Sequence, residues 1–263
     1  MEFNIEPSKY TVTIGKDNSQ IDSTRHTAVF GATGSGKTDF CINKMVELAG
    51  KENGFVYFSS KNNCEKINSD NKKLLERLPE NRLDDVEYIS IDSKDLSELD
   101  IPDFEKYIEE NKIVIVNSKT VSDTPAYEML INEIIGAKID SDYYIFVEDI
   151  INTLRIQNIV KYTQLLDQDN INLWYTIQDL TNIPDYIYYM LARTRNYIIT
   201  TVHTKDSGLI YLDDKELSYL DTLNFETYCY YDSYLNTSEK VEFKRQDELS
   251  KKRDIKDIEY LLE

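Results

Sequence analysis

A glycine-rich segment, GATGSGKT, constrains the fold of this 263-residue chain more than any other feature. It follows the apolar run TAVF at 27–30 and precedes a segment with apolar residues at helical spacing that stops at Gly50. The pattern GxxxxGK[ST] between a strand and a helix is typical of a phosphate-binding loop, where backbone amides and a helix N-terminus surround phosphate groups. We therefore expect an ATP site formed by Gly31, Ala32, Thr33, Gly34, Ser35, Gly36, Lys37 and Thr38.

Two side chains of this loop have expected roles of their own. Lys37 should bridge the β- and γ-phosphates, and the Thr38 hydroxyl should bind Mg²⁺. The predicted cofactors are accordingly ATP and Mg²⁺.

Short apolar runs rich in Val, Ile, Tyr and Phe alternate with helical patterns along the chain, which predicts an α/β fold with a mostly parallel sheet and helices on both faces. With the loop, this predicts a P-loop NTPase domain of RecA/ASCE-like type. We expect one domain over 1–263, with a core at about 24–203 and a C-terminal β-ribbon and helix at about 204–263. The expected strands are 27–30, 55–60, 86–91, 112–118, 143–149, 171–178 and 196–202, with the most apolar, YYIFVED, at the centre of the sheet. The expected helices are 126–137, 151–166 and 184–194, besides the one that follows the loop.

Composition excludes several classes of protein. The three cysteines form no CxxC pair, so a zinc site or disulfide framework is not expected. No apolar run approaches the roughly 18 residues of a membrane span, and no signal peptide is evident, which predicts a cytoplasmic protein. The net charge of -18 argues against a surface that binds nucleic acid throughout.

The negative charge is concentrated between Pro79 and Glu110, where twelve acidic residues against three basic ones give -9. This stretch is either a solvated acidic face or a docking surface for a basic partner. Any DNA partner must therefore contact another part of the molecule.

Glu148 and Asp149 end the apolar strand YYIFV, where such an ATP site needs one carboxylate for the metal shell and a second for the attacking water. We assign Glu148 to the metal and Asp149 to the water, although the usual order of such a pair is Asp then Glu. Alternatively, the two acids cap the next helix.

Gln178 ends the strand INLWYTIQ, where a carboxamide can contact both the γ-phosphate and the water; a lone polar strand-end residue is the alternative. Hydrolysis also needs an arginine near the developing charge, often from a neighbouring subunit. Arg193 and Arg195 are preferred over Arg155, and a surface ion pair or a helix cap is the alternative for each.

The segments GATGSGKT, IFVED and LWYTIQD, in this order, resemble the FtsK-HerA superfamily of ring ATPases over about residues 27–202. The segment QDLTNIPDYIYYMLARTRNYII is similar to compact genome-packaging ATPases of double-stranded DNA viruses. The resemblance implies a homo-oligomeric hexamer or pentamer ring that hydrolyses ATP to move double-stranded DNA, in the host cytoplasm or associated with the virion. A capsid or other virion protein is a further partner that it implies. It also implies that Lys61 matches a lysine that often follows the second strand.

Three functions remain open at this point. The leading one is a DNA-translocating motor that packages a viral or mobile-element genome. The second is a conjugation coupling protein or HerA-like translocase. The third is a nucleotide-dependent switch or assembly factor that binds protein, which the charge of -18 favours.

Overall fold

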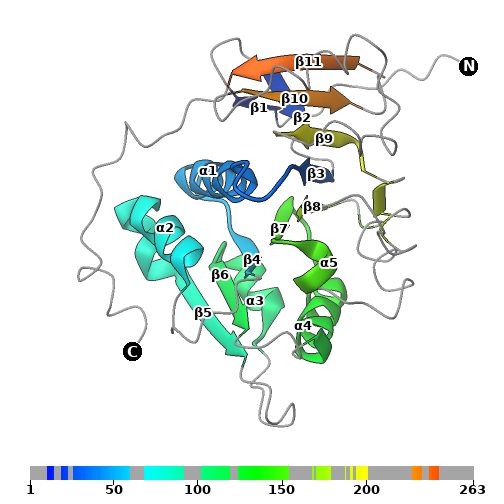
Figure 1. The fold of residues 1–263 in the computed structure, drawn as a ribbon. Helices are drawn as coiled ribbons and strands as arrows, with labels where there is room; N and C mark the ends of the chain where they lie inside the picture. The colour runs from blue at the N-terminus through cyan, green and yellow to red at the C-terminus, as the bar shows by residue number, and fades with distance from the viewer. Residues whose placement is uncertain are drawn as a thin grey trace, which may run out of the picture.

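The computed structural model of the chain describes residues 11–14, 19–22, 26–59, 68–91, 102–118, 124–153, 168, 170–178, 187, 190–191, 194–200, 227–232 and 237–242. Within these residues, strands and helices alternate through most of the chain (Figure 1). The strands are β1 (Thr11–Ile14), β2 (Ser19–Asp22), β3 (Thr27–Phe30), β4 (Phe55–Ser59), β5 (Val86–Ile91), β6 (Ile113–Ser118), β7 (Tyr143–Val147), β8 (Ile171–Ile177), β9 (Asn196–Ile199), β10 (Thr227–Asp232) and β11 (Thr237–Glu242). The helices are α1 (Lys37–Gly50), α2 (Ser69–Arg77), the 3-10 helix η1 (Glu80–Asp85), α3 (Phe104–Glu109), α4 (Thr124–Gly136) and α5 (Ile150–Thr153).

A nine-stranded sheet with the order β11-β10-β9-β3-β8-β7-β4-β6-β5 forms the centre of the molecule. Every neighbouring pair from β9 to β5 is parallel, whereas β10 and β11 are antiparallel additions at one edge. The strand β8 lies between β3 and β7. The carboxyl ends of these three parallel strands therefore lie side by side along one side of the sheet. This order brings the glycine-rich loop, Gln178 and the acidic pair to the same place.

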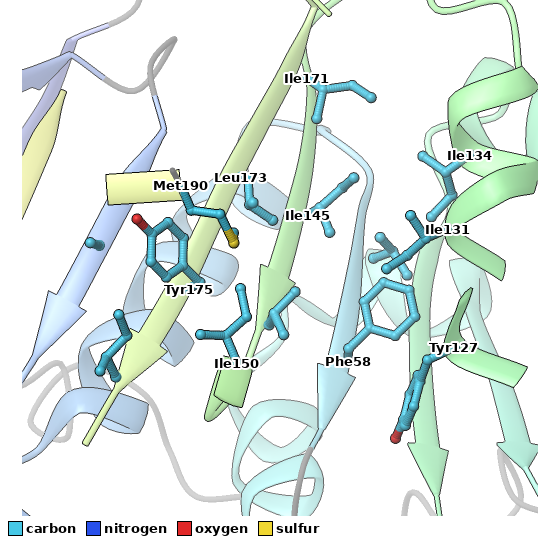
Figure 2. Packing of buried hydrophobic residues seen from close by; sticks show 14 of the residues in the cluster. Phe58, Tyr127, Ile131, Ile134, Ile145, Ile150, Ile171, Leu173, Tyr175 and Met190 are labelled. Carbon is cyan, nitrogen blue, oxygen red and sulfur yellow. The ribbon is translucent and has the colours of Figure 1, made fainter. Parts of the chain in front are cut away.

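Helices cover both faces of the sheet, because successive residues of each strand point to opposite sides. On one face, α1 and α2 pack over side chains that include Phe55, Tyr57 and Trp174. On the other face, α3, α4 and α5 pack over a cluster that includes Phe58, Ile145 and Leu173 (Figure 2). The parallel strands β7 and β8 are buried along their whole length on both faces, which explains their nearly continuous apolar sequence.

The predicted fold class is confirmed, and α1 ends at Gly50 as expected. The predicted sheet-centre strand, now β7, is flanked by β8 and β4. Part of the C-terminal β-ribbon is present as the hairpin of β10 and β11. The rest of the expected helix 151–166 after Thr153 and the expected C-terminal helix lie outside the described residues. The hairpin of β1 and β2 and the helices α2 and α3 had not been predicted.

Candidate nucleotide site

The glycine-rich loop leaves β3 at the edge where β8 and β9 also end, and it leads directly into α1 (Figure 1). Gly34 and Gly36 have φ angles of 76° and 90°, a left-handed region that favours glycine. Thr33 and Gly34 are exposed, so the turn is open to solvent at its tip. The loop is therefore shaped to present backbone amides and the α1 N-terminus to an anion.

The Lys37 side chain folds back against this loop, and its ammonium group makes two hydrogen bonds there. It donates to the carbonyl oxygens of Gly31, at 2.7 Å, and of Ala32, at 2.9 Å. Burial lowers the pKa of Lys37, and the nearby Asp149 carboxylate is the strongest group that opposes this shift. The amine is thus held at the mouth of the loop, where it can exchange one carbonyl for a phosphate oxygen.

Hydroxyl groups from the loop and from β4 donate to the Glu148 carboxylate. The Thr38 hydroxyl donates to Oε1 at 2.8 Å, and the Tyr57 hydroxyl donates to Oε2 at 3.0 Å. The backbone amide of Glu148 donates to the carbonyl of Phe58 at 3.0 Å, which continues the β4–β7 pairing to the strand end. Glu148 is only 7% exposed, so its carboxylate faces the loop rather than bulk solvent.

Asp149 adopts a left-handed backbone conformation with a φ of 44°. The Thr176 hydroxyl accepts a hydrogen bond of 2.7 Å from its amide, and its carbonyl accepts one of 2.9 Å from the amide of Thr153. Asp149 therefore occupies the position just before α5, which fits the capping alternative. The same carboxylate raises the pKa of Lys37, against the larger effect of burial.

Gln178 contacts the loop directly, because its amide nitrogen donates to the Thr33 hydroxyl. Gln178 is exposed and follows the last residue of β8. The carboxamide at the end of β8 therefore lies against the tip of the loop, close to where it was expected.

Of the predicted arginines, Arg195 lies within the described residues, and it is not part of this site. Arg195 lies at the amino ends of the strands, on the side of the sheet away from the loop, since the adjoining Asn196 is paired with Thr27 at the start of β3. Its Nε and Nη2 atoms lie 3.0 and 2.9 Å from Oδ2 of Asp232, and the side chains of the two residues are 17% and 5% exposed. Arg195 thus joins β9 to β10, which is the ion-pair alternative. Arg155, Arg193 and Lys61 lie outside the described residues.

Thr200 is a site residue that sequence reasoning missed. Its hydroxyl donates to the Phe30 carbonyl at 2.7 Å, so the 2.7 Å contact with Ser35 has the Ser35 hydroxyl as donor. A Cβ atom on Gly31 would lie 1.9 Å from the Thr200 hydroxyl oxygen, which explains the glycine there. The available signal was its position directly after the strand NYII, which ends at the same edge of the sheet.

The oxygen atoms at this site fit a Mg²⁺ ion. The Thr38 hydroxyl and the Glu148 carboxylate are hard oxygen donors side by side at the mouth of the loop. Among the described residues no cluster of three or more His, Cys, Asp or Glu could hold a metal. Mg²⁺ typically keeps several water ligands and binds through one or two protein groups plus substrate phosphates, which matches this sparse set.

The fold and the loop geometry together define a P-loop NTPase fold. No protein-family model matches the chain, and no curated protein matches its sequence. Solved structures of FtsK-HerA-type P-loop ATPases do match, which confirms the predicted resemblance at the level of the fold.

The genome packaging NTPase B204 of Sulfolobus turreted icosahedral virus 2, in complex with ATP-gammaS, matches with a TM-score of 0.58 and 11% identity. The match covers 85% of this chain and 100% of B204. The pCW3 conjugation coupling protein TcpA matches with a TM-score of 0.56 and 14% identity, over 98% of this chain and 72% of TcpA. VirB4 of Thermoanaerobacter pseudethanolicus matches with a TM-score of 0.61 and 8% identity, over 91% of this chain and 97% of VirB4.

Proposed function

We propose that this protein is an ATP-hydrolysing motor that moves double-stranded DNA and packages a viral or mobile-element genome. The observation that carries the proposal is the meeting of the loop, Glu148, Asp149 and Gln178 at one edge of the sheet. The match over the whole length of the viral packaging NTPase supports packaging in particular.

Each residue of the site has a proposed part in hydrolysis. Lys37 binds the β- and γ-phosphates, while Thr38 and Glu148 hold the Mg²⁺ shell. Bound Mg²⁺ neutralises charge on the phosphates. Asp149 orients the attacking water and accepts its proton, and Gln178 contacts both that water and the γ-phosphate.

The trans arginine is proposed to come from a neighbouring subunit of a hexamer or pentamer ring. Of the two candidates, Arg193 is preferred, because Arg195 would first have to leave its ion pair with Asp232. Separating such a largely buried pair leaves an uncompensated charge, which is strongly unfavourable. The proposed site of action is the cytoplasm of a host cell or a virion. No helix in the described part of the chain has the length and apolar character of a membrane span.

Two other functions have support of their own. The fold match to TcpA supports a conjugation coupling protein or a related translocase. The net charge of -18 supports a nucleotide-dependent assembly factor that binds protein, including a capsid or other virion protein, without contacting DNA.

Duplex DNA is expected to raise the ATPase rate of the purified protein. Contacts between basic side chains and phosphates weaken steeply with salt, so the stimulation should decline as salt increases. The measurement is steady-state phosphate release with and without linear duplex DNA at several salt concentrations. An assembly factor would hydrolyse ATP at the same rate with and without DNA, and that result would exclude the motor.

The variant Gln178→Ala is expected to bind nucleotide as the wild type does but to lose DNA stimulation. The reason is that Gln178 contacts the loop only at its exposed tip, through Thr33, while Lys37 and Thr38 remain in place. Gln168→Ala is a matched control, because the Gln168 side-chain amide donates to the Ile135 carbonyl, at 2.9 Å, before the start of β8 and away from the loop. DNA-stimulated hydrolysis at the wild-type level in Gln178→Ala would remove Gln178 from the site.

A further inference from the structure

The carboxylate of Glu148 is oriented by a tyrosine from the neighbouring strand. Tyr57 lies on β4 opposite Phe146 of β7, and its side chain points to the α1 face of the sheet, as the Glu148 side chain does. Its hydroxyl donates to Oε2 at 3.0 Å. Tyr57 is 1% exposed, so water cannot readily replace this donor.

The two oxygens of Glu148 therefore have separate partners. Oε1 faces the loop and accepts from Thr38, whereas Oε2 faces the sheet and accepts from Tyr57. Two donors on opposite sides of a carboxylate fix its rotation, which leaves one defined oxygen toward the metal position. A phenylalanine of the same shape would leave Oε2 without this donor, and the carboxylate would be free to turn away from the loop.

We propose that Tyr57 is a positioning residue that presents Glu148 to the metal ion of the nucleotide complex; this inference rests on the proposed ATPase function. Mutating a residue that hydrogen-bonds a metal ligand typically lowers metal affinity by about 10- to 100-fold. Tyr57 therefore governs the affinity for the metal and leaves the affinity for the nucleotide alone unchanged.

The test measures Mn²⁺ affinity by electron paramagnetic resonance in the presence of a non-hydrolysable ATP analogue. Tyr57→Phe is expected to weaken Mn²⁺ binding by about 10-fold. Its affinity for the analogue in EDTA should equal that of the wild type. Wild-type protein that binds no analogue with Mn²⁺ would refute the proposed function itself, whereas normal Mn²⁺ affinity in Tyr57→Phe would overturn only the role of Tyr57.

Tyr175→Phe is the matched control for the loss of a buried tyrosine hydroxyl. The Tyr175 hydroxyl lies 2.6 Å from the Thr194 hydroxyl, and its ring packs on the opposite face of the sheet (Figure 2). This variant should keep wild-type Mn²⁺ affinity. An equal loss in both variants would mean that the effect is one of general packing, and the proposal would fail.

A double-mutant cycle with Glu148→Gln separates positioning from folding effects. If Tyr57 acts through the Glu148 carboxylate, adding Tyr57→Phe to Glu148→Gln should weaken Mn²⁺ binding no further. The same additional 10-fold loss in that background would show that Tyr57 acts by another route. Thermal unfolding of each variant, followed by circular dichroism, fixes a temperature at which all of them are folded.

Discussion

Lys37→Ala is expected to abolish ATP turnover. The Lys37 ammonium is held at the mouth of the loop by two carbonyls of the loop itself, at 2.7 and 2.9 Å. Its removal takes away the positive charge beside the proposed β- and γ-phosphates and loosens the resting loop. Loss of a single preorganised donor to a developing charge typically lowers kcat by about 10²- to 10³-fold, and this donor also serves binding.

Steady-state ATP hydrolysis and equilibrium binding of a fluorescent ATP analogue measure the effect. Lys51→Ala is the control, because Lys51 follows the C-terminus of the same helix, where its amine pairs with Glu47 in an exposed position. That variant should bind and hydrolyse ATP normally. Turnover by Lys37→Ala at the wild-type rate would contradict the whole phosphate-loop assignment.

Lys44→Met is expected to stabilise the fold. The Lys44 side chain is 1% exposed, and its ammonium lies 3.8 Å from the nearest Glu47 oxygen and has no hydrogen bond to any residue that the structure describes. The rings of Tyr144 and Trp174 lie 5.9 and 5.8 Å away, at the outer limit of a cation–π contact. Methionine has a similar length and an apolar tip, so it fits the same space without a buried charge.

The stabilisation should depend on pH. Burial lowers the pKa of Lys44 from 10.5 to about 7, and Glu47 only partly opposes this effect. Between these two values the unfolded chain holds a proton at Lys44 that the folded chain has lost, so wild-type stability rises with pH across that window. At pH 7 and below, nearly the full free-energy cost of burying the Lys44 ammonium is present in the wild type. There the variant should gain roughly 2–4 kcal/mol in the free energy of unfolding. Near pH 10 the gain should shrink to below about 1 kcal/mol.

Urea unfolding of the wild type and of Lys44→Met at a series of pH values gives the difference in their free energies of unfolding. The titration of every other group is common to the two proteins and cancels in this difference. Lys51→Met is the control, because Lys51 is exposed and its replacement should change stability little at any pH. A Lys44→Met protein that is less stable than the wild type at pH 7 would show that Lys44 is charged and well paired in the fold.

Much of the fold could be predicted because parallel strands buried on both faces leave a strong sequence signal. The strands β3, β7 and β8 appear as the apolar runs TAVF, YYIFV and INLWYTI, and the structure places them within two residues of the expected bounds. The helix α2 was missed, because its sequence SDNKKLLER is polar except for two leucines. Its stability comes from packing against α1 and from the Asn68 cap, whose side chain accepts from the amides of residues 70 and 71.

The residues of the candidate site also fall into those that the sequence predicted and those that it did not. Residues that belong to a local motif, or that end an apolar strand, could be named from the sequence: the loop, Glu148, Asp149 and Gln178. Tyr57 and Thr200 could not, since one is among twenty tyrosines and the other follows a strand with no motif. Arg195 was chosen for its place just before a strand, and that place does not reveal that its guanidinium lies 2.9 Å from the Asp232 carboxylate.

The sequence by itself determined the phosphate loop, the α/β class and the strand ends that carry carboxylates and an amide, because these depend on local spacing and on the burial of consecutive residues. Only the tertiary structure decided which of those strand ends are neighbours, since that depends on the order of strands in the sheet. The insertion of β8 between β3 and β7 brings Gln178 to Thr33, and the pairing of β4 with β7 brings Tyr57 to Glu148. Both contacts join residues far apart in the chain, and no local pattern encodes them.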